Sequence, residues 1–281
     1  MQVKQRTIKK EISLTGKSLQ TGKRSVMICR PALPGEGISF TRSDITSCPK
    51  IKLSDGNFSE SGRRRTQIGV SGVKLQTLEH FMGALWALGI DNLEVEVSAS
   101  ELPAMDGSAL GFLEPLRQTG IEEQESPRKY IKVDRPIRIA DKERTITVLP
   151  AEKFSVSYTI DYPVQCIKNG TFSLALDGDT FEREIAPART FCMKKEAVFL
   201  FFSGLGRGAT FENTLVLGDK GPVRTKFRFP DEPVRHKVLD LVGDLYMLGV
   251  PVIAEFICER SGHALNARVL REIYSKYVRQ T

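Results

Sequence analysis

Apolar residues recur at helical spacing in two segments of the chain, residues 78–88 (LEHFMGALWAL) and 234–248 (VRHKVLDLVGDLYML). Each segment ends at a glycine, Gly89 or Gly249, and glycine is the residue that most often follows the last turn of a helix. Thr77 directly precedes the first segment, where a threonine hydroxyl is expected to cap the helix. The pattern therefore predicts two amphipathic helices, the second about one turn longer.

The same order of elements occurs in both halves of the chain. Each predicted helix is preceded by alternating, strand-like runs and followed by an apolar strand-like run, a Gly/Ser turn and a second helix. The same 27 positions separate His80 from Gly107 and His236 from His263. The polar segment 118–130 (QTGIEEQESPRKY) is typical of a linker. We therefore expect an α+β fold of two duplicated domains, residues 1–124 and 128–281, with the helix pairs packed between two outer sheets.

Composition and charge narrow the functional classes. Hydrophobic residues make up 41% of the chain and charged residues 27%, as in globular proteins, and no apolar run approaches the roughly 18 to 20 residues of a membrane span. The first 14 residues lack the apolar core of a secretory signal, and the five cysteines form no C-x-x-C pair, so we expect a cytoplasmic protein with reduced thiols. The net charge of +7 favours an anionic partner. Its densest cluster is only Arg63–Arg65, and no zinc-finger or RNA-recognition signature accompanies it, so nucleic-acid binding stays only as an alternative.

The three histidines carry the candidate chemistry. His236 and Asp240 stand four residues apart on one predicted helix face, which is the spacing by which a helix supplies two ligands to one metal ion. Hydrolytic zinc sites use three His or carboxylate ligands, and His80 occupies the equivalent position of the duplicated helix. His263 and Asp244 complete the set. A histidine near a helix start is also an ordinary capping or core residue, but burying all these groups without a shared partner is costly.

Five segments resemble the UDP-3-O-acyl-N-acetylglucosamine deacetylases, zinc enzymes of the committed step of lipid A synthesis. They are QTLEHFMGALWALGIDNLEVEV, MDGSA, ARTF, VRHKVLDLVGDLYMLG and SGHALN. The resemblance begins near the N-terminus, at QRTIKKEISLTGKSLQTG, and runs to the last helix. It implies an enzyme that releases acetate from a UDP-linked, 3-O-acylated glucosamine. A zinc amidohydrolase acting on a different acylated or sugar substrate is the main alternative.

The resemblance also implies a role for each residue of the site. His80, His236 and Asp240 would be the zinc ligands, although Fe²⁺ suits the same set. Glu79 would be the general base toward the attacking water, and His263 the cationic acid toward the leaving amine. The remaining implied roles are Asp244 holding the His263 ring, Thr190 stabilising the oxyanion, and substrate contacts by Lys237, Tyr162, Asp161, Arg260, Phe191 and Phe199.

Two further expectations concern the substrate entrance and the partners. Residues 194–206 (KKEAVFLFFSGLG) lie where the family encloses the acyl chain, so Phe199, Phe201 and Phe202 are expected to line that passage, with core packing as the alternative. Gln20 stands where the family usually has histidine, and GLGRGAT (204–210) lacks the usual Gly-Gly-Ser. We expect a monomer without a nucleic-acid partner that touches a membrane surface at most transiently.

Overall fold

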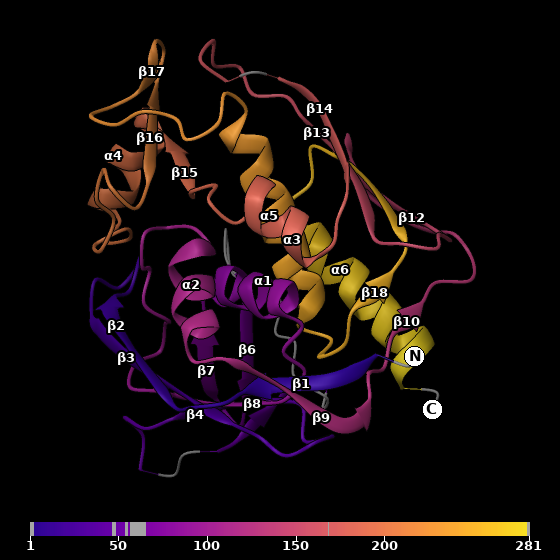
Figure 1. Ribbon diagram of the computed structural model, residues 1–281. Helices are drawn as coiled ribbons and strands as arrows, with labels where there is room; N and C mark the ends of the chain where they lie inside the picture. The colour runs from indigo at the N-terminus through magenta and orange to yellow at the C-terminus, as the bar shows by residue number, and fades with distance from the viewer. Residues whose placement is uncertain (1–2, 47–48, 54–55, 57–65, 168, 280–281) are drawn as a thin grey trace.

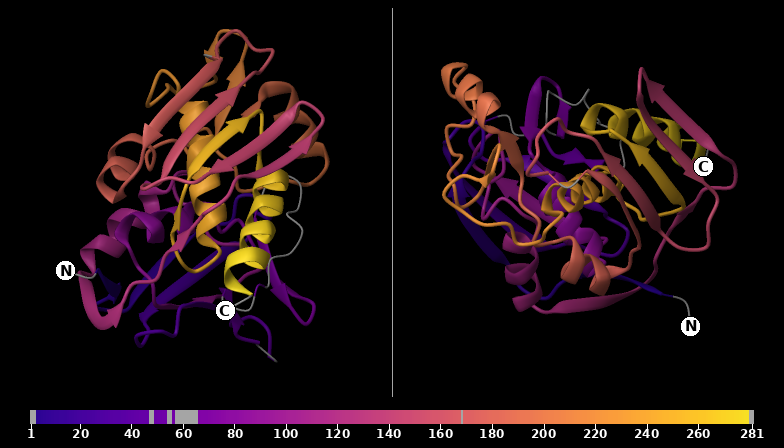
Figure 2. Two further views of the ribbon diagram at one scale, coloured as in Figure 1. Left: turned by 90° about the vertical axis from the view of Figure 1, so that its right-hand side faces the viewer. Right: turned by 90° about the horizontal axis from the view of Figure 1, so that it is seen from above.

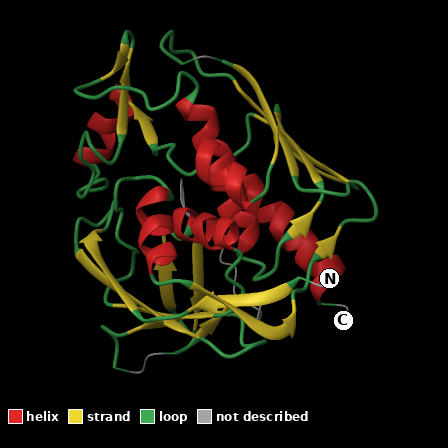
Figure 3. Cartoon of the chain, in the orientation of Figure 1, coloured by secondary structure: helices red, strands yellow, loops and turns green. Residues whose placement is uncertain are grey.

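The computed structural model describes residues 3–46, 49–53, 56, 66–167 and 169–279. Most of the helices occupy the middle of the molecule, and most of the strands lie outside them (Figure 3). The helices are α1 (Glu79–Leu88), α2 (Leu110–Gln118), α3 (Gly178–Glu184), α4 (Lys194–Phe202), α5 (Glu232–Tyr246) and α6 (His263–Ile273), the last continued by a π-helical turn, Tyr274–Val278. No helix of the described residues has the length and apolar character needed to cross a membrane.

Two five-stranded sheets with the same topology flank the helices (Figure 1). In strand order, the first contains β2 (Ile12–Lys17), β3 (Arg24–Pro31), β8 (Leu93–Val97), β4 (Ile38–Arg42) and β5 (Ile51–Lys52). The second contains β11 (Ile137–Asp141), β12 (Arg144–Leu149), β19 (Glu255–Glu259), β13 (Ser155–Ile160) and β14 (Gly170–Ala175). In both, the neighbours pair antiparallel, antiparallel, parallel and antiparallel. The predicted duplication and the α+β class are confirmed.

Each sheet buries the face that its alternating sequence predicts. Along β8, Leu93, Val95 and Val97 are buried toward the helices, while Glu94 and Glu96 are partly exposed. The two helix pairs then meet across a close contact between α1 and α5. A Cβ atom at Gly243 of α5 would overlap the backbone of Glu79, so only glycine allows the two helices to approach this closely.

Smaller strands are added to this duplicated frame. They are β1 (Lys4–Ile8) with β9 (Ile121–Pro127), β10 (Ile131–Lys132) with β18 (Val252–Ile253), the hairpin β6 (Gln67–Val70) and β7 (Val73–Gln76), and β15 (Phe191–Met193) with β16 (Leu215–Gly218) and β17 (Gly221–Pro222). The last group and α4 project beside the helical layer, above the N-terminal half (Figures 1 and 2). This group and the β6–β7 hairpin border the site described below.

Two local expectations were wrong. The segment 118–130 is not a linker through its whole length, because Ile121–Pro127 forms β9 and pairs antiparallel with β1. Thr77 does not cap α1. Its backbone has a positive φ of 58°, and its hydroxyl donates a hydrogen bond to Glu101 Oε1 at 3.0 Å, so α1 begins after Leu78 without a side-chain cap. Gly89, in contrast, ends α1 in the left-handed conformation as expected.

Candidate metal centre and active site

Helices α1 and α5 bring three potential metal ligands together. His80 lies in the first turn of α1, and His236 and Asp240 lie one turn apart on α5. One ligand atom from each lies within 4.8 Å of the other two, and all three residues are buried. Asp240 Oδ1 is 3.3 Å from His236 Nε2 and 3.9 Å from His80 Nε2. The predicted cluster is therefore formed.

The protonation of both histidines suits a metal. Burial lowers the pKa of His80 to about 3, and burial also lowers the pKa of His236. Both rings are therefore neutral near pH 7. The Ala188 carbonyl lies 3.0 Å from His236 Nδ1 and accepts its proton, which leaves the Nε2 lone pair facing Asp240.

Asp240 supplies the test of whether a cation fits. Its Oδ1 is buried and accepts no hydrogen bond from any described residue, a costly state for a carboxylate oxygen unless a cation meets it. Burial alone would raise the pKa of Asp240, but the cationic side chains of Lys237 and His263 hold it well below the usual range. Two neutral imidazoles and one ionised carboxylate are a donor set that zinc accepts, with further coordination positions left for water or substrate.

Glu79 borders this cluster as the first residue of α1. Its carboxylate is buried, and burial raises its pKa to about 7, although the charge of His263 opposes the rise. Glu79 Oε2 accepts a hydrogen bond from the Thr66 backbone N–H at 3.2 Å. A carboxylate with a pKa near neutrality is suited to exchange protons with a substrate or water.

His263 faces Glu79 from the start of α6. Its Nε2 is 3.9 Å from Glu79 Oε1 and 3.6 Å from Asp240 Oδ2. Its Nδ1 donates to Asp244 Oδ2 at 2.8 Å. Burial opposes protonation of the ring, but the charges of Asp244, Asp240 and Glu79 outweigh it and raise the pKa to about 10. His263 is therefore a cation at neutral pH.

A cavity of about 1330 Å³ opens over these groups. Thr190 and Phe191 lie on its wall, as do Tyr162 and Lys237. Phe191 packs edge-on to Tyr162 at 5.7 Å between ring centroids, and the Lys237 ammonium lies 5.7 Å from the centre of the Phe191 ring. Lys237 is not an exposed helix lysine, because it is mostly buried and its Nζ contacts Asp240 Oδ2 at 2.7 Å.

Arg260 and Asp161 lie on the same cavity wall but contact each other. Arg260 Nη2 is 2.9 Å from Asp161 Oδ2, and its Nη1 is 2.6 Å from Glu143 Oε2. All three side chains are largely exposed. An anionic ligand reaching this guanidinium has to compete with two carboxylates.

The structure places Phe199 differently from the expectation. Phe199 is 68% exposed, does not contribute to the cavity wall, and lies with Phe202 on the outer side of α4. Ala197 and Leu200 of the same helix line the cavity instead. Successive side chains of a helix point about 100° apart, so Phe199 and Leu200 face different directions. The side chain of Phe201 lies outside the described part of the chain.

The two departures from the family pattern lie together at the cavity wall. Gln20 Oε1 accepts from the Gly206 N–H at 3.2 Å, and the Gln20 carbonyl accepts from the Arg207 N–H at 3.2 Å. Both Gln20 and the 204–210 segment contribute to the cavity lining. The basic cluster Arg63–Arg65 lies outside the described residues.

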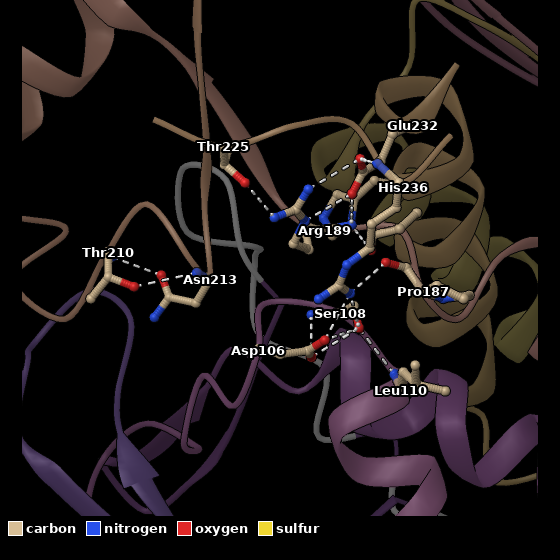
Figure 4. A network of polar contacts seen from close by, with 12 residues as sticks. Asp106, Ser108, Leu110, Pro187, Arg189, Thr210, Asn213, Thr225, Glu232 and His236 are labelled. Carbon is tan, nitrogen blue, oxygen red and sulfur yellow. Dashed lines mark hydrogen bonds and ion pairs between the residues drawn. The ribbon is translucent and has the colours of Figure 1, made fainter. Parts of the chain in front are cut away.

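Sequence reasoning missed several groups that hold the site together. Thr66 donates its N–H to Glu79 and its hydroxyl to Asp244 Oδ1, and Asn266 Nδ2 donates to Asp244 Oδ2 at 2.8 Å. Arg189 and Glu232 form a buried ion pair beside His236 (Figure 4). Helical spacing could have pointed to two of these residues, because Glu232 precedes His236 by four residues and Asn266 follows His263 by three.

Comparisons with known proteins identify the family of the chain. Residues 5–275 match the family model described as UDP-3-O-acyl N-acetylglycosamine deacetylase. A UDP-3-O-acyl-N-acetylglucosamine deacetylase of Alcanivorax borkumensis is 39% identical over 96% of this chain and 90% of its own length. Proteins of the same name from Pseudomonas entomophila and an Anaeromyxobacter species are 37% and 36% identical, over 98% and 96% of this chain and 91% and 88% of their own. The chain belongs to the UDP-3-O-acyl-N-acetylglucosamine deacetylase family, whose members are hydrolases that act on an amide.

Proposed function

We propose that this protein hydrolyses the N-acetyl group of a UDP-linked, 3-O-acylated N-acetylglucosamine with the help of a zinc ion. The observation that carries the proposal is that Glu79 and His263 lie beside the His80, His236 and Asp240 cluster, with Glu79 Oε1 3.9 Å from His263 Nε2, and that all five residues line one cavity. When bound, zinc supplies Lewis acidity, which brings the pKa of a coordinated water to roughly 7 and polarises a carbonyl. Fe²⁺ accepts the same ligands.

The protein's own groups supply the proton transfers. Glu79, whose pKa is about 7, takes a proton from the attacking water, and His263, whose pKa is about 10, holds a proton for the nitrogen that leaves. Asp244 fixes the His263 ring through Nδ1 and keeps it cationic. Thr190 lines the same cavity, and its hydroxyl donates to the oxygen on which negative charge develops.

The shape of the cavity supports the identity of the substrate. Apolar side chains from α4 and from the strands beside it line one part of it, which suits an acyl chain, whereas Tyr162, Lys237 and Arg260 line another, which suits the sugar nucleotide. Tyr162 provides an aromatic face for a base, and Arg260 provides a cation for a diphosphate.

The test is acetate release from the UDP-linked substrate, measured on the purified protein before and after removal of the metal with a chelator. We expect activity to disappear with the metal and to return with added zinc. A parallel substrate that lacks the 3-O-acyl group should be turned over with a much lower kcat/KM, because it leaves the apolar part of the cavity unfilled. Equal turnover of both substrates, or activity unaffected by complete metal removal, would contradict the proposal.

The pH dependence of kcat/KM should be bell-shaped. Activity should fall below about pH 7 as Glu79 becomes protonated, and fall above about pH 10 as His263 loses its proton. A bound dication adds positive charge beside both groups, so it moves both limbs toward lower pH. Asp244 contributes most to raising the pKa of His263, so Asp244→Asn should shift the alkaline limb to lower pH and narrow the bell. An alkaline limb that does not move in this variant would rule out His263 as its source.

A further inference from the structure

We propose that Arg189 and Glu232 are positioning residues that fix the metal-binding tautomer and orientation of His236 through the intervening backbone. The inference rests on the proposed metal site, and it concerns groups that do not touch the metal ligands with their own side chains. The segment 187–190, called here the orienting segment, contains Arg189 and contacts His236 through the Ala188 carbonyl. Figure 4 shows the Arg189–Glu232 pair beside His236.

Glu232, in the first turn of α5, accepts hydrogen bonds from the orienting segment. Its side chain is fully buried, one helical turn before His236. Its Oε1 accepts from both the backbone N–H and Nε of Arg189, each at 3.0 Å. Its Oε2 accepts from the Arg228 N–H at 2.6 Å. The Glu232 carboxylate therefore connects the backbone at Arg189 to the backbone at Arg228, in addition to pairing with the Arg189 guanidinium.

The other N–H groups of the Arg189 guanidinium donate hydrogen bonds to the loop that precedes α5. Nη1 donates to Thr225 Oγ1 at 3.2 Å, and Nη2 donates to the Lys226 carbonyl at 2.6 Å. The side chain is 5% exposed. The planar fork of a guanidinium can serve these acceptors at once, whereas a lysine ammonium cannot reproduce the same directions.

These contacts of Arg189 also fix the two residues on either side of it, Ala188 and Thr190. The carbonyl of Ala188 accepts the Nδ1 proton of His236, so its direction decides which nitrogen of the ring faces Asp240. On the other side, the Thr190 N–H donates to the Gly107 carbonyl at 2.8 Å. Arg189 lies between Ala188 and Thr190, and its backbone N–H donates to Glu232 Oε1. This single hydrogen bond therefore helps to fix both the carbonyl that contacts His236 and the position of Thr190.

Arg228 connects this anchor to the first half of the chain. Its Nη1 donates to the Pro187 carbonyl and to Asp106 Oδ2, both at 2.8 Å, while its own N–H is held by Glu232. Asp106 also accepts from the Ser108 hydroxyl. The orienting segment is thus fixed against both halves, one of which supplies His80 and the other His236 and Asp240 (Figure 4).

A purely structural ion pair predicts a different outcome from a positioning pair. A buried pair is weak evidence for a stabilising role, because the cost of desolvating two charges offsets their attraction. Outer groups that orient a metal-ligating histidine, in contrast, typically change metal affinity by about 10–100-fold when they are mutated. Metal affinity therefore separates the two roles.

The experiment measures zinc affinity of the full-length protein by competition with a chelator, for wild type, Glu232→Gln and Arg189→Lys. We expect each variant to bind zinc about 10–100-fold more weakly than wild type. Co²⁺-substituted protein should also show a changed visible spectrum, since the direction of the His236 ring alters the ligand field. Glu232→Gln retains an acceptor for the Arg189 N–H, so it should lose less affinity than Glu232→Ala.

Asp91→Asn is the matched control. Asp91 is a buried carboxylate that likewise accepts from a backbone N–H, that of Arg6 at 3.0 Å, and from an arginine Nε, that of Arg128 at 2.9 Å, but it contacts no metal ligand. It should keep the zinc affinity and the Co²⁺ spectrum of wild type. Wild-type affinity in Glu232→Gln and Arg189→Lys, or an equal loss in Asp91→Asn, would overturn the inference. A wild-type protein that binds no zinc would instead overturn the proposed function.

Discussion

Replacing Glu79 with glutamine is expected to lower kcat for acetate release by about 10²–10⁴-fold while zinc remains bound. Glutamine has nearly the same shape and can still accept the Thr66 N–H that Glu79 Oε2 accepts at 3.2 Å, so the local fold should persist. It cannot take a proton from water. The loss should therefore appear in kcat, with zinc content and the melting temperature close to those of wild type.

The pH profile makes this expectation specific. Because Glu79 has a pKa of about 7, the residual activity of Glu79→Gln should lose the acid limb and keep the alkaline one. Glu101→Gln is the control, since Glu101 is a fully buried carboxylate of the same half that accepts hydrogen bonds from the Gln20 N–H and the Thr77 hydroxyl but contacts no metal ligand. Its kcat should stay within a few-fold of wild type. A Glu79→Gln variant with normal turnover would show that another group is the base.

The fold was predictable where apolar periodicity decides the structure. The helices at 79–88 and 232–246 have apolar residues at helical spacing and the strand at 93–97 alternates, and the repetition of this order in both halves predicts the duplication. The strand at 121–127 was missed because it is almost entirely polar, with Gln124 as its best-buried side chain. Its pairing with β1 depends on backbone hydrogen bonds and on exposed ion pairs such as Arg6–Glu123, which leave no periodic signal in the sequence.

The clustering of His80, His236 and Asp240 was predictable for a related reason. His236 and Asp240 are one turn apart on one helix, and the duplication related His80 to His236, so spacing and symmetry together brought the three residues to one point. The groups that orient the cluster carry no such signal. Thr66, directly before β6, contacts Glu79 and Asp244, which lie on two different helices. The contact of Ala188 with His236 is made by a backbone carbonyl, which any residue type provides.

Thr77 shows how tertiary contacts override a local rule. A threonine before an apolar helix is a good capping residue when its hydroxyl is free to turn toward the first backbone N–H groups. Here the buried carboxylate of Glu101 accepts that hydroxyl and also the N–H groups of Gln20 and Thr21. A buried carboxylate is a stronger hydrogen-bond partner for the Thr77 hydroxyl than a backbone N–H group, so the hydroxyl does not cap the helix.

Replacing Asp240 with asparagine is expected to reduce zinc affinity by more than the roughly 10–100-fold that follows the loss of an outer partner, because it removes a charged ligand. Asp240 Oδ1 accepts no hydrogen bond from the described residues, so its charge is available to a metal ion. Asparagine keeps an oxygen for Lys237, which contacts Asp240 Oδ2 at 2.7 Å, and so limits the disturbance of the helix. Zinc content after dialysis and the affinity from chelator competition measure the effect.

The matched comparison is Asp244→Asn, one turn further along the same helix. Asp244 is equally buried, but it holds His263 at 2.8 Å and does not belong to the cluster of ligands, so this variant should retain zinc. Excess zinc should restore part of the activity of Asp240→Asn, whereas it should restore none in Asp244→Asn or Glu79→Gln, whose defects lie in proton transfer. Stoichiometric, tightly bound zinc in Asp240→Asn would remove Asp240 from the ligand set. Zinc loss in both aspartate variants would mean that the charge of the buried cluster as a whole, and not direct ligation by one carboxylate, holds the metal.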